Sequence, residues 1–106
     1  MAADSEFRDS LLGKLAPLEN LSCRSMFGGY GIFTDASMFG LISGSALFFK
    51  VDDSNLAAYE EAGSKKYGPM PYYRVPDAIL EDSAKLLEWA RASVNIAEAK
   101  PKKKRG

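Results

Sequence analysis

Hydrophobic residues near the amino end recur every three or four positions, which is the spacing of one face of an α-helix. The residues with this spacing are Phe7, Leu11, Leu12, Leu15 and Leu18. Asp4 or Ser5 can cap the first turn, because its side-chain oxygen accepts a hydrogen bond from the backbone amides there. Pro17 lacks an amide hydrogen and disfavours helix in the residue before it. The pattern predicts a helix that begins at Asp4 or Ser5 and ends near Ala16.

From Cys23 to Val51 the spacing changes to two, which is typical of β-strands because successive side chains point to opposite faces. The apolar residues that alternate in this way are Tyr30, Ile32, Phe39, Leu41, Leu47, Phe49 and Val51. Short polar or glycine-containing breaks at residues 34–37 and 43–45 are typical of hairpin turns. We expect three antiparallel strands, at about 29–34, 37–43 and 46–51.

The second half of the chain predicts a shorter helix and two further strands. Asp52 or Asp53 can cap a helix over residues 54–61, and Gly63 can close it. Two short strands are expected at 65–67 and 72–75. The prolines in the segment between them favour an edge or a turn over a central strand.

A helical turn and a long helix complete the predicted elements. The turn is expected at residues 75–77, where a proline follows a valine. Asp82 can cap a helix that runs from Ser83 to about Ala97. We assign its inner face to Leu86, Leu87, Ala90 and Val94.

The predicted order is helix, three strands, helix, two strands, helix. Antiparallel strands with helices segregated to one face form a two-layer α+β domain, here with a sheet of about five strands. The other face of such a sheet can stay open to a partner. We expect one domain over residues 1–99 and a disordered basic tail over residues 100–106.

Composition narrows the range of functions. A chain of 106 residues with 46% hydrophobic and 26% charged residues is ordinary for one soluble domain. It has no histidine and one cysteine, which removes the commonest general base and the usual zinc ligands. The amino end lacks a basic segment followed by an apolar run, and the longest uncharged stretch, 36–49, is too short to cross a bilayer. We therefore expect a cytoplasmic protein with no catalytic residues, no metal and no cofactor.

Charge is unevenly distributed, although the net charge is zero. Residues 1–99 hold 9 basic and 14 acidic residues, a net charge of −5, and the last seven residues carry +5. The tail cations that can contact nucleic-acid phosphates without reading base sequence are Lys102, Lys103, Lys104 and Arg105. A solvated tail without that role is the alternative. The acidic remainder is repelled by duplex DNA, which favours contact with a protein partner.

A few side chains carry candidate chemistry, and each has a structural alternative. Cys23 is a nucleophile only if a neighbour such as Arg24 lowers its thiol pKa, and a buried strand cysteine is the favoured interpretation. The acid pairs at 52–53 and 60–61 are interpreted as helix caps and solvated residues rather than as a Mg²⁺ site. Lys50 is interpreted as an outward-facing lysine at a strand end.

The most informative segment joins glycines to large apolar residues at the start of the first expected strand. We assign contact with a protein partner to this segment and the neighbouring sheet surface; the residues are Phe27, Gly28, Gly29, Tyr30 and Gly31. The alternative is that the glycines only shape a tight bend or bulge. The segment is not a phosphate-binding loop, because strand pattern and not helix follows it.

Aromatic residues on the expected sheet raise the question of base stacking. They are Phe27, Tyr30, Phe33, Phe39, Phe48 and Phe49. Sheets that bind single-stranded nucleic acid combine such rings with basic side chains. No basic residue occurs between Arg24 and Lys50, so we assign the aromatic residues to the core.

Several blocks of the sequence, in this order, resemble one known family. The blocks are residues 26–33, 39–42, 47–53, 59–63, 70–76, 80–82 and 89–91. Over about residues 10–97 the chain looks like the amino-terminal domain of TfoX/Sxy-type competence regulators. The resemblance implies a bacterial cytoplasmic protein with a two-layer α+β fold, in a family with no established catalytic residues. Better-known members are positive regulators of DNA-uptake genes and work with a cyclic-AMP-receptor-type activator.

The leading hypothesis is therefore a non-enzymatic transcription-accessory protein that contacts a DNA-bound activator. The tail is expected to add weak, non-specific DNA contact. The alternative is a stand-alone module that binds a protein or a small ligand, or pairs with a second copy of itself, and has no role at DNA.

Overall fold

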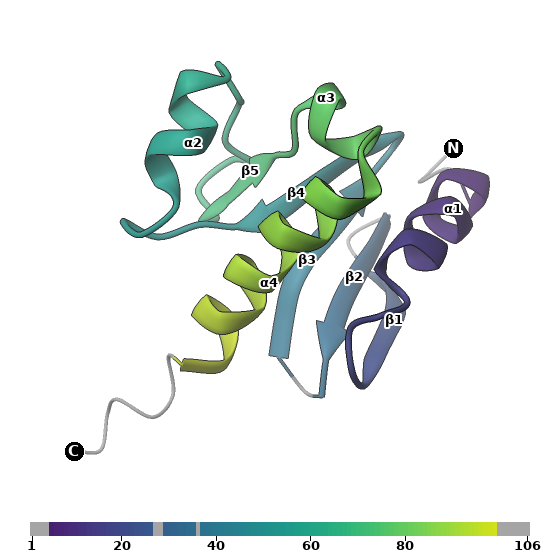
Figure 1. The fold of residues 1–106 in the computed structure, drawn as a ribbon. Helices are drawn as coiled ribbons and strands as arrows, with labels where there is room; N and C mark the ends of the chain where they lie inside the picture. The colour runs from purple at the N-terminus through teal and green to yellow at the C-terminus, as the bar shows by residue number, and fades with distance from the viewer. Residues whose placement is uncertain (1–4, 27–28, 36, 100–106) are drawn as a thin grey trace.

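Five antiparallel strands form one sheet in which each strand pairs with the next one along the chain (Figure 1). The computed structural model describes residues 5–26, 29–35 and 37–99. The strands are β1 (Leu21–Met26), β2 (Gly29–Thr34), β3 (Ser37–Ser43), β4 (Ala46–Lys50) and β5 (Tyr72–Arg74). The helices are α1 (Ser5–Leu15), α2 (Leu56–Glu61), α3 (Asp77–Leu80) and α4 (Ser83–Ala99). The expected α+β class, with an antiparallel sheet and helices, is confirmed.

The three strands expected at 29–34, 37–43 and 46–51 occur almost as predicted. Gly44 adopts φ +63° in the turn between β3 and β4, a left-handed conformation that glycine reaches without strain. The turn between β2 and β3 includes Asp35 at φ 56°, whose amide donates to the Asn20 carbonyl over 3.1 Å. Ala36 lies outside the described residues.

The sequence pattern missed β1, which pairs with β2 along its whole length from Leu21↔Thr34 to Met26↔Gly29. Leu21 and Cys23 are half-buried while Ser22 and Arg24 are exposed, so burial alternates over the first four residues of the strand. Its side chains are too polar to make an apolar period-two pattern. Because β1 is an edge strand, only one of its faces is partly covered by other side chains. It therefore needs few apolar residues, which explains its weak hydrophobic pattern.

The elements after β4 differ in detail from the prediction. Helix α2 begins at Leu56, and the Asp52 carboxylate does not cap it but accepts hydrogen bonds from the Ser54 amide and hydroxyl at 2.8 and 2.6 Å. Gly63 follows the helix with φ +71°, as expected for the residue that closes it. The strand expected at 65–67 is reduced to a single bridge between Lys66 and Tyr73. The helical turn expected at 75–77 is the start of α3.

Helix α4 crosses the sheet in front of β3 and β4 (Figure 1). Asp82 caps it as predicted, accepting from the Ala84 and Lys85 amides at 3.1 and 3.2 Å. Of the assigned inner face, Leu86 and Ala90 are fully buried, whereas Leu87 and Val94 are only half-buried. The contact line continues instead through Ser93 and Ala97, which are buried. Ser93 tolerates burial because its hydroxyl donates to the Lys50 carbonyl over 2.7 Å.

The core lies between the sheet and the helices. Strand β3 has a register shift opposite Ile32 and Phe33, so that Gly40 pairs with Ile32 but Met38 pairs with Phe33. The extra residue is Phe39, and a bulge of this kind breaks strict alternation. Phe39 and Ile42 therefore both join the core cluster, although they are three positions apart. Leu41, expected on the same face as Phe39, instead pairs with Gly31 and Phe48 on the opposite face.

Gly29 is required by the close pairing of β2 with β3. A Cβ there would collide with the backbone carbonyl oxygen of Ile42, whereas a Cβ on Gly31 would meet the Met26 sulfur at 2.7 Å. We expect Gly29→Ala to lower the free energy of unfolding by about 2–3 kcal/mol, and Gly31→Ala by about 1 kcal/mol because thioether side chains can move. Urea denaturation measures both.

Gly13 provides the matched control, because it lies in α1 and nothing outside its own stretch of helix backbone comes within 4 Å of the point that a Cβ would occupy. Gly13→Ala is expected to raise the free energy of unfolding by about 0.5–1 kcal/mol, since alanine favours helix. Equal effects of alanine at positions 13 and 29 would contradict the backbone collision at Gly29.

Candidate functional site

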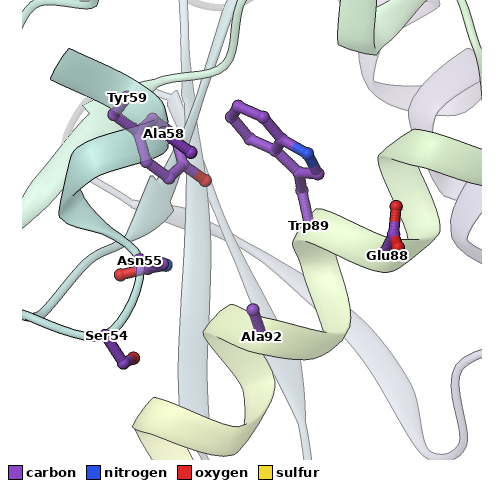
Figure 2. Close-up of a pocket in the computed structure, with 7 residues that line it drawn as sticks. All are labelled: Ser54, Asn55, Ala58, Tyr59, Glu88, Trp89 and Ala92. Carbon is purple, nitrogen blue, oxygen red and sulfur yellow. The ribbon is translucent and has the colours of Figure 1, made fainter. Parts of the chain in front are cut away.

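A cleft of about 340 Å³ lies between α2 and α4 (Figure 2). Its lining residues are Ser54, Asn55, Ala58, Tyr59, Glu88, Trp89 and Ala92. The volume lies at the lower end of the range of small-molecule pockets and also suits one side chain of a protein partner. The cleft combines two aromatic rings with polar groups.

Two helices that are far apart in the sequence supply the walls of the cleft. Ala58 and Tyr59 come from α2, and Trp89 and Ala92 come from α4 one turn apart (Figure 2). The Tyr59 and Trp89 rings meet edge-to-face with centroids 4.7 Å apart at 64°. This aromatic contact holds α2 against α4 and leaves Trp89 half-buried at the cleft.

The hydroxyl group of Tyr59 is buried and forms no hydrogen bond within the described part of the chain. Burial raises the pKa of Tyr59, so the side chain stays neutral at physiological pH. Ser93 lies near enough to lower the pKa of Tyr59 by a smaller amount, but the two hydroxyl groups do not meet hydrogen-bond geometry. The Ser93 hydroxyl donates its proton to the Lys50 carbonyl instead. The hydroxyl is thus an unusual unsatisfied group beside the cleft.

The polar rim of the cleft is fixed by local hydrogen bonds. The Asn55 side chain accepts from the Asp52 amide at 2.9 Å and donates to the Lys50 carbonyl at 3.3 Å. Hydrogen bonds from the Ser54 hydroxyl and amide lower the pKa of Asp52, which is therefore ionised at neutral pH. Residues 52–63 contain four acids and no base, so this side of the cleft is negatively charged.

The glycine-rich segment does not form one surface. Gly29 and Gly31 are buried within β2, while Tyr30 is half-buried on the helix-covered face, with the Arg8 guanidinium 4.7 Å from its ring centroid. Phe27 and Gly28 lie outside the described residues, as do the tail residues 102–105. Partner contact at residues 27–31 remains a prediction, and the two described glycines have a packing role of their own.

The candidate nucleophile is not activated. Cys23 is half-buried, and burial is the main cause that raises its thiol pKa, against a smaller lowering by Arg8. The expected helper, Arg24, lies with its guanidinium 5.2 Å from the Phe33 ring centroid and does not lower the pKa of Cys23. Within residues 5–26, 29–35 and 37–99, no cluster of three or more histidine, cysteine or acidic residues is arranged to hold a metal ion.

Sequence reasoning did not select Tyr59 and Trp89 as site residues. Their aromatic pairing joins α2 to α4 across 30 positions of sequence, and no local pattern encodes that contact. One signal was present, because Trp89 is the single tryptophan of the chain and lies next to the core positions of α4.

Comparisons with known proteins bear on most of the chain. Residues 14–97, from the end of α1 almost to the end of α4, match the family model of the TfoX N-terminal domain. The family resemblance seen in the sequence is thereby confirmed. No curated protein matches the chain. Among the described residues, no helix has the length and apolar character needed to cross a membrane.

Removing the Tyr59 hydroxyl tests whether it is unsatisfied. Tyr59→Phe is expected to leave the free energy of unfolding within about 0.5 kcal/mol of the parent value or to raise it, because no hydrogen bond is lost. Ser93→Ala removes the bond to the Lys50 carbonyl and is expected to cost about 1 kcal/mol. A larger loss for Tyr59→Phe than for Ser93→Ala, measured by thermal and urea unfolding, would show that the hydroxyl is bonded.

Alkylation measures the state of Cys23. A raised pKa leaves less thiolate at pH 8 than in an unstructured cysteine peptide, and partial burial slows access further. We expect iodoacetamide to react with the folded protein several-fold more slowly than with the peptide. Reaction faster than the peptide would identify an activated thiol.

Proposed function

The chain belongs to the TfoX N-terminal domain family, and we propose from this membership that it is a non-enzymatic transcription-accessory protein related to DNA transformation. In this proposal it acts by contacting a DNA-bound activator of the cyclic-AMP-receptor type. The cleft between α2 and α4 is a contact site in this proposal, in addition to the contact predicted at residues 27–31. The family match over residues 14–97 is the observation that carries the proposal.

The shape and charge of the cleft support a protein partner. Trp89 stands half-buried at an apolar recess, and tryptophan is enriched among residues that dominate binding energy at interfaces. Acidic residues flank it in the segment 52–63 and at Glu88. Proteins that bind DNA carry basic surfaces, so an acidic rim attracts such a partner and speeds the encounter.

Direct duplex binding by the helix side of the domain is disfavoured by charge. Residues 1–99 carry 9 basic and 14 acidic residues, and α2 with the loop before it carries only acids. Duplex phosphates repel such a surface. A partner that makes the DNA contacts removes this difficulty, because the accessory protein then binds to protein.

The chemistry of the cleft supports binding rather than catalysis. The buried Tyr59 stays protonated, and the Asn55 amide is committed to backbone groups. The chain has no histidine to shuttle protons at neutral pH. The groups at this site can orient and hold a partner, and we include the absence of enzymatic activity in the proposal.

A bulky cation in the cleft tests the proposal. Ala58→Arg places a long charged side chain on the exposed side of α2 at the lining, and Ala57→Arg makes the same change on the same helix outside the lining. Binding is measured by interferometry to a cyclic-AMP-receptor-type activator immobilised on its promoter duplex. Ala58→Arg is expected to weaken it at least tenfold, and Ala57→Arg less than threefold.

Thermal unfolding of both variants checks that the fold is retained. Equal binding by parent, Ala58→Arg and Ala57→Arg would exclude the cleft as the contact. No binding by the parent protein, together with unchanged transcription of DNA-uptake genes on deletion, would favour a stand-alone module that binds a ligand or a second copy of itself.

A further inference from the structure

The charged residues of the sheet are all positive. Strands β1, β4 and β5 each hold one, namely Arg24, Lys50 and Arg74, whereas every described acid lies in a helix or a connecting segment. This contrasts with the acidic balance of the rest of the domain. The sheet therefore carries a local charge opposite to that of the helix layer.

Strand register places these cations on the face opposite the helices. Arg24 pairs with Gly31, Arg74 with Phe48, and Lys50 with Tyr72. Directly paired residues project to the same side of a sheet, as do residues two apart on one strand. Leu41, which pairs with both Gly31 and Phe48, lies on this side too. We call this side the open face; the core cluster of Ile32, Ile42, Leu47 and Phe49 occupies the other.

Aromatic and thioether side chains fill the open face between the cations. Phe33 lies near Gly31 together with the Met26 and Met38 sulfurs, since all three approach the position of a Cβ there. The Phe48 ring meets Tyr67 edge-to-face at 4.9 Å. Phe33 and Phe48 are half-buried, whereas Leu41 and Tyr72 on the same face are buried.

Each cation lies beside an aromatic ring or a weak ionic partner. The Arg24 guanidinium is 5.2 Å from the Phe33 centroid, and the Lys50 ammonium is 5.3 Å from the Tyr72 centroid. Arg74 meets Asp77 at 3.4 Å, and the two side chains are 45% and 74% exposed. Exposed ion pairs of this kind contribute little, so a phosphate group can compete for the arginine.

We propose that the open face binds single-stranded nucleic acid. Bases stack on Phe33 and Phe48, and backbone phosphates contact Arg24, Lys50 and Arg74. Stacking on rings of a sheet flanked by cations is the general physical basis of sequence-tolerant single-strand binding. Duplex DNA is excluded because its bases are already stacked and its second strand adds phosphates toward an acidic domain. This activity lies on the face opposite the α2–α4 cleft and does not depend on the proposed activator contact.

Fluorescence anisotropy of a labelled twelve-nucleotide oligothymidine with the full-length protein tests the proposal. Arg24→Gln combined with Arg74→Gln is expected to weaken binding at least tenfold at low salt. The three open-face phosphate contacts contribute about −2 to the slope of log affinity against log salt, and removing two of them lowers the magnitude of the slope by about 1.4. The matched control combines Lys85→Gln with Arg91→Gln, two exposed cations of α4, and is expected to change affinity less than twofold.

Stacking and the tail are tested separately. Phe33→Leu keeps an apolar side chain but removes the aromatic face, and is expected to weaken binding about tenfold. Replacing residues 102–105 with glutamine is expected to reduce affinity for the oligonucleotide. The loss of affinity caused by Arg24→Gln and Arg74→Gln is expected to stay the same in that background. A duplex of the same length is expected to bind at least tenfold more weakly than the single strand.

Four results would overturn the proposal. The first is equal affinity of the parent, the variant with Arg24 and Arg74 replaced, and the control variant. The second is loss of all binding when the tail is neutralised, and the third is equal affinity for the duplex. The fourth is competition by a glutamate-rich peptide that is as strong as competition by unlabelled oligothymidine. The last result would assign the open face to acidic protein segments. The outcome of the Ala58→Arg test does not affect these measurements, because Ala58 lies on α2 on the other side of the sheet.

Discussion

The packing of α4 across β3 and β4 is the contact on which the rest of the structure depends. Its line of Leu86, Ala90, Ser93 and Ala97 lies against the sheet, and the Ser93 hydroxyl ties the helix to the end of β4 through the Lys50 carbonyl. Small residues at three of these four positions let helix and sheet approach closely. The contact gives the sheet one covered face, and Trp89, on the same helix, then meets Tyr59 to form the cleft.

Covering one face separates the molecule into two electrostatic surfaces. The helix layer and its connections hold all the described acids, and the strands hold three cations that register places on the open face. The domain, whose net charge over residues 1–99 is −5, therefore presents surfaces of opposite sign. The proposed contact with a basic, DNA-bound protein and the inferred binding of a single strand use these two surfaces, so that both can operate in one protein at one promoter.

The two described glycines of the glycine-rich segment have a packing role. Gly29 allows β2 to approach the Ile42 carbonyl, and Gly31 makes room for Met26, Phe33 and Met38 on the open face. Neither residue offers a side chain for recognition. Gly29 and Gly31 instead shape the sheet on which their neighbours lie.

The sequence by itself determined the α+β class, the strands from Gly29 to Lys50 and the Asp82 cap, because each depends on spacing within a few residues. It also identified the family, through several blocks that occur in order along most of the chain. It did not reveal β1, whose polar residues need only partial cover, or the bulge at Phe39, which moved Leu41 to the opposite face. The apparent lack of cations between Arg24 and Lys50 argued against a stacking surface. In the tertiary structure, β-pairing brings cations from β1, β4 and β5 beside Phe33 and Phe48, so the cations that a stacking surface needs are present. The sequence could not show this, because linear spacing contains no information about cross-strand neighbours.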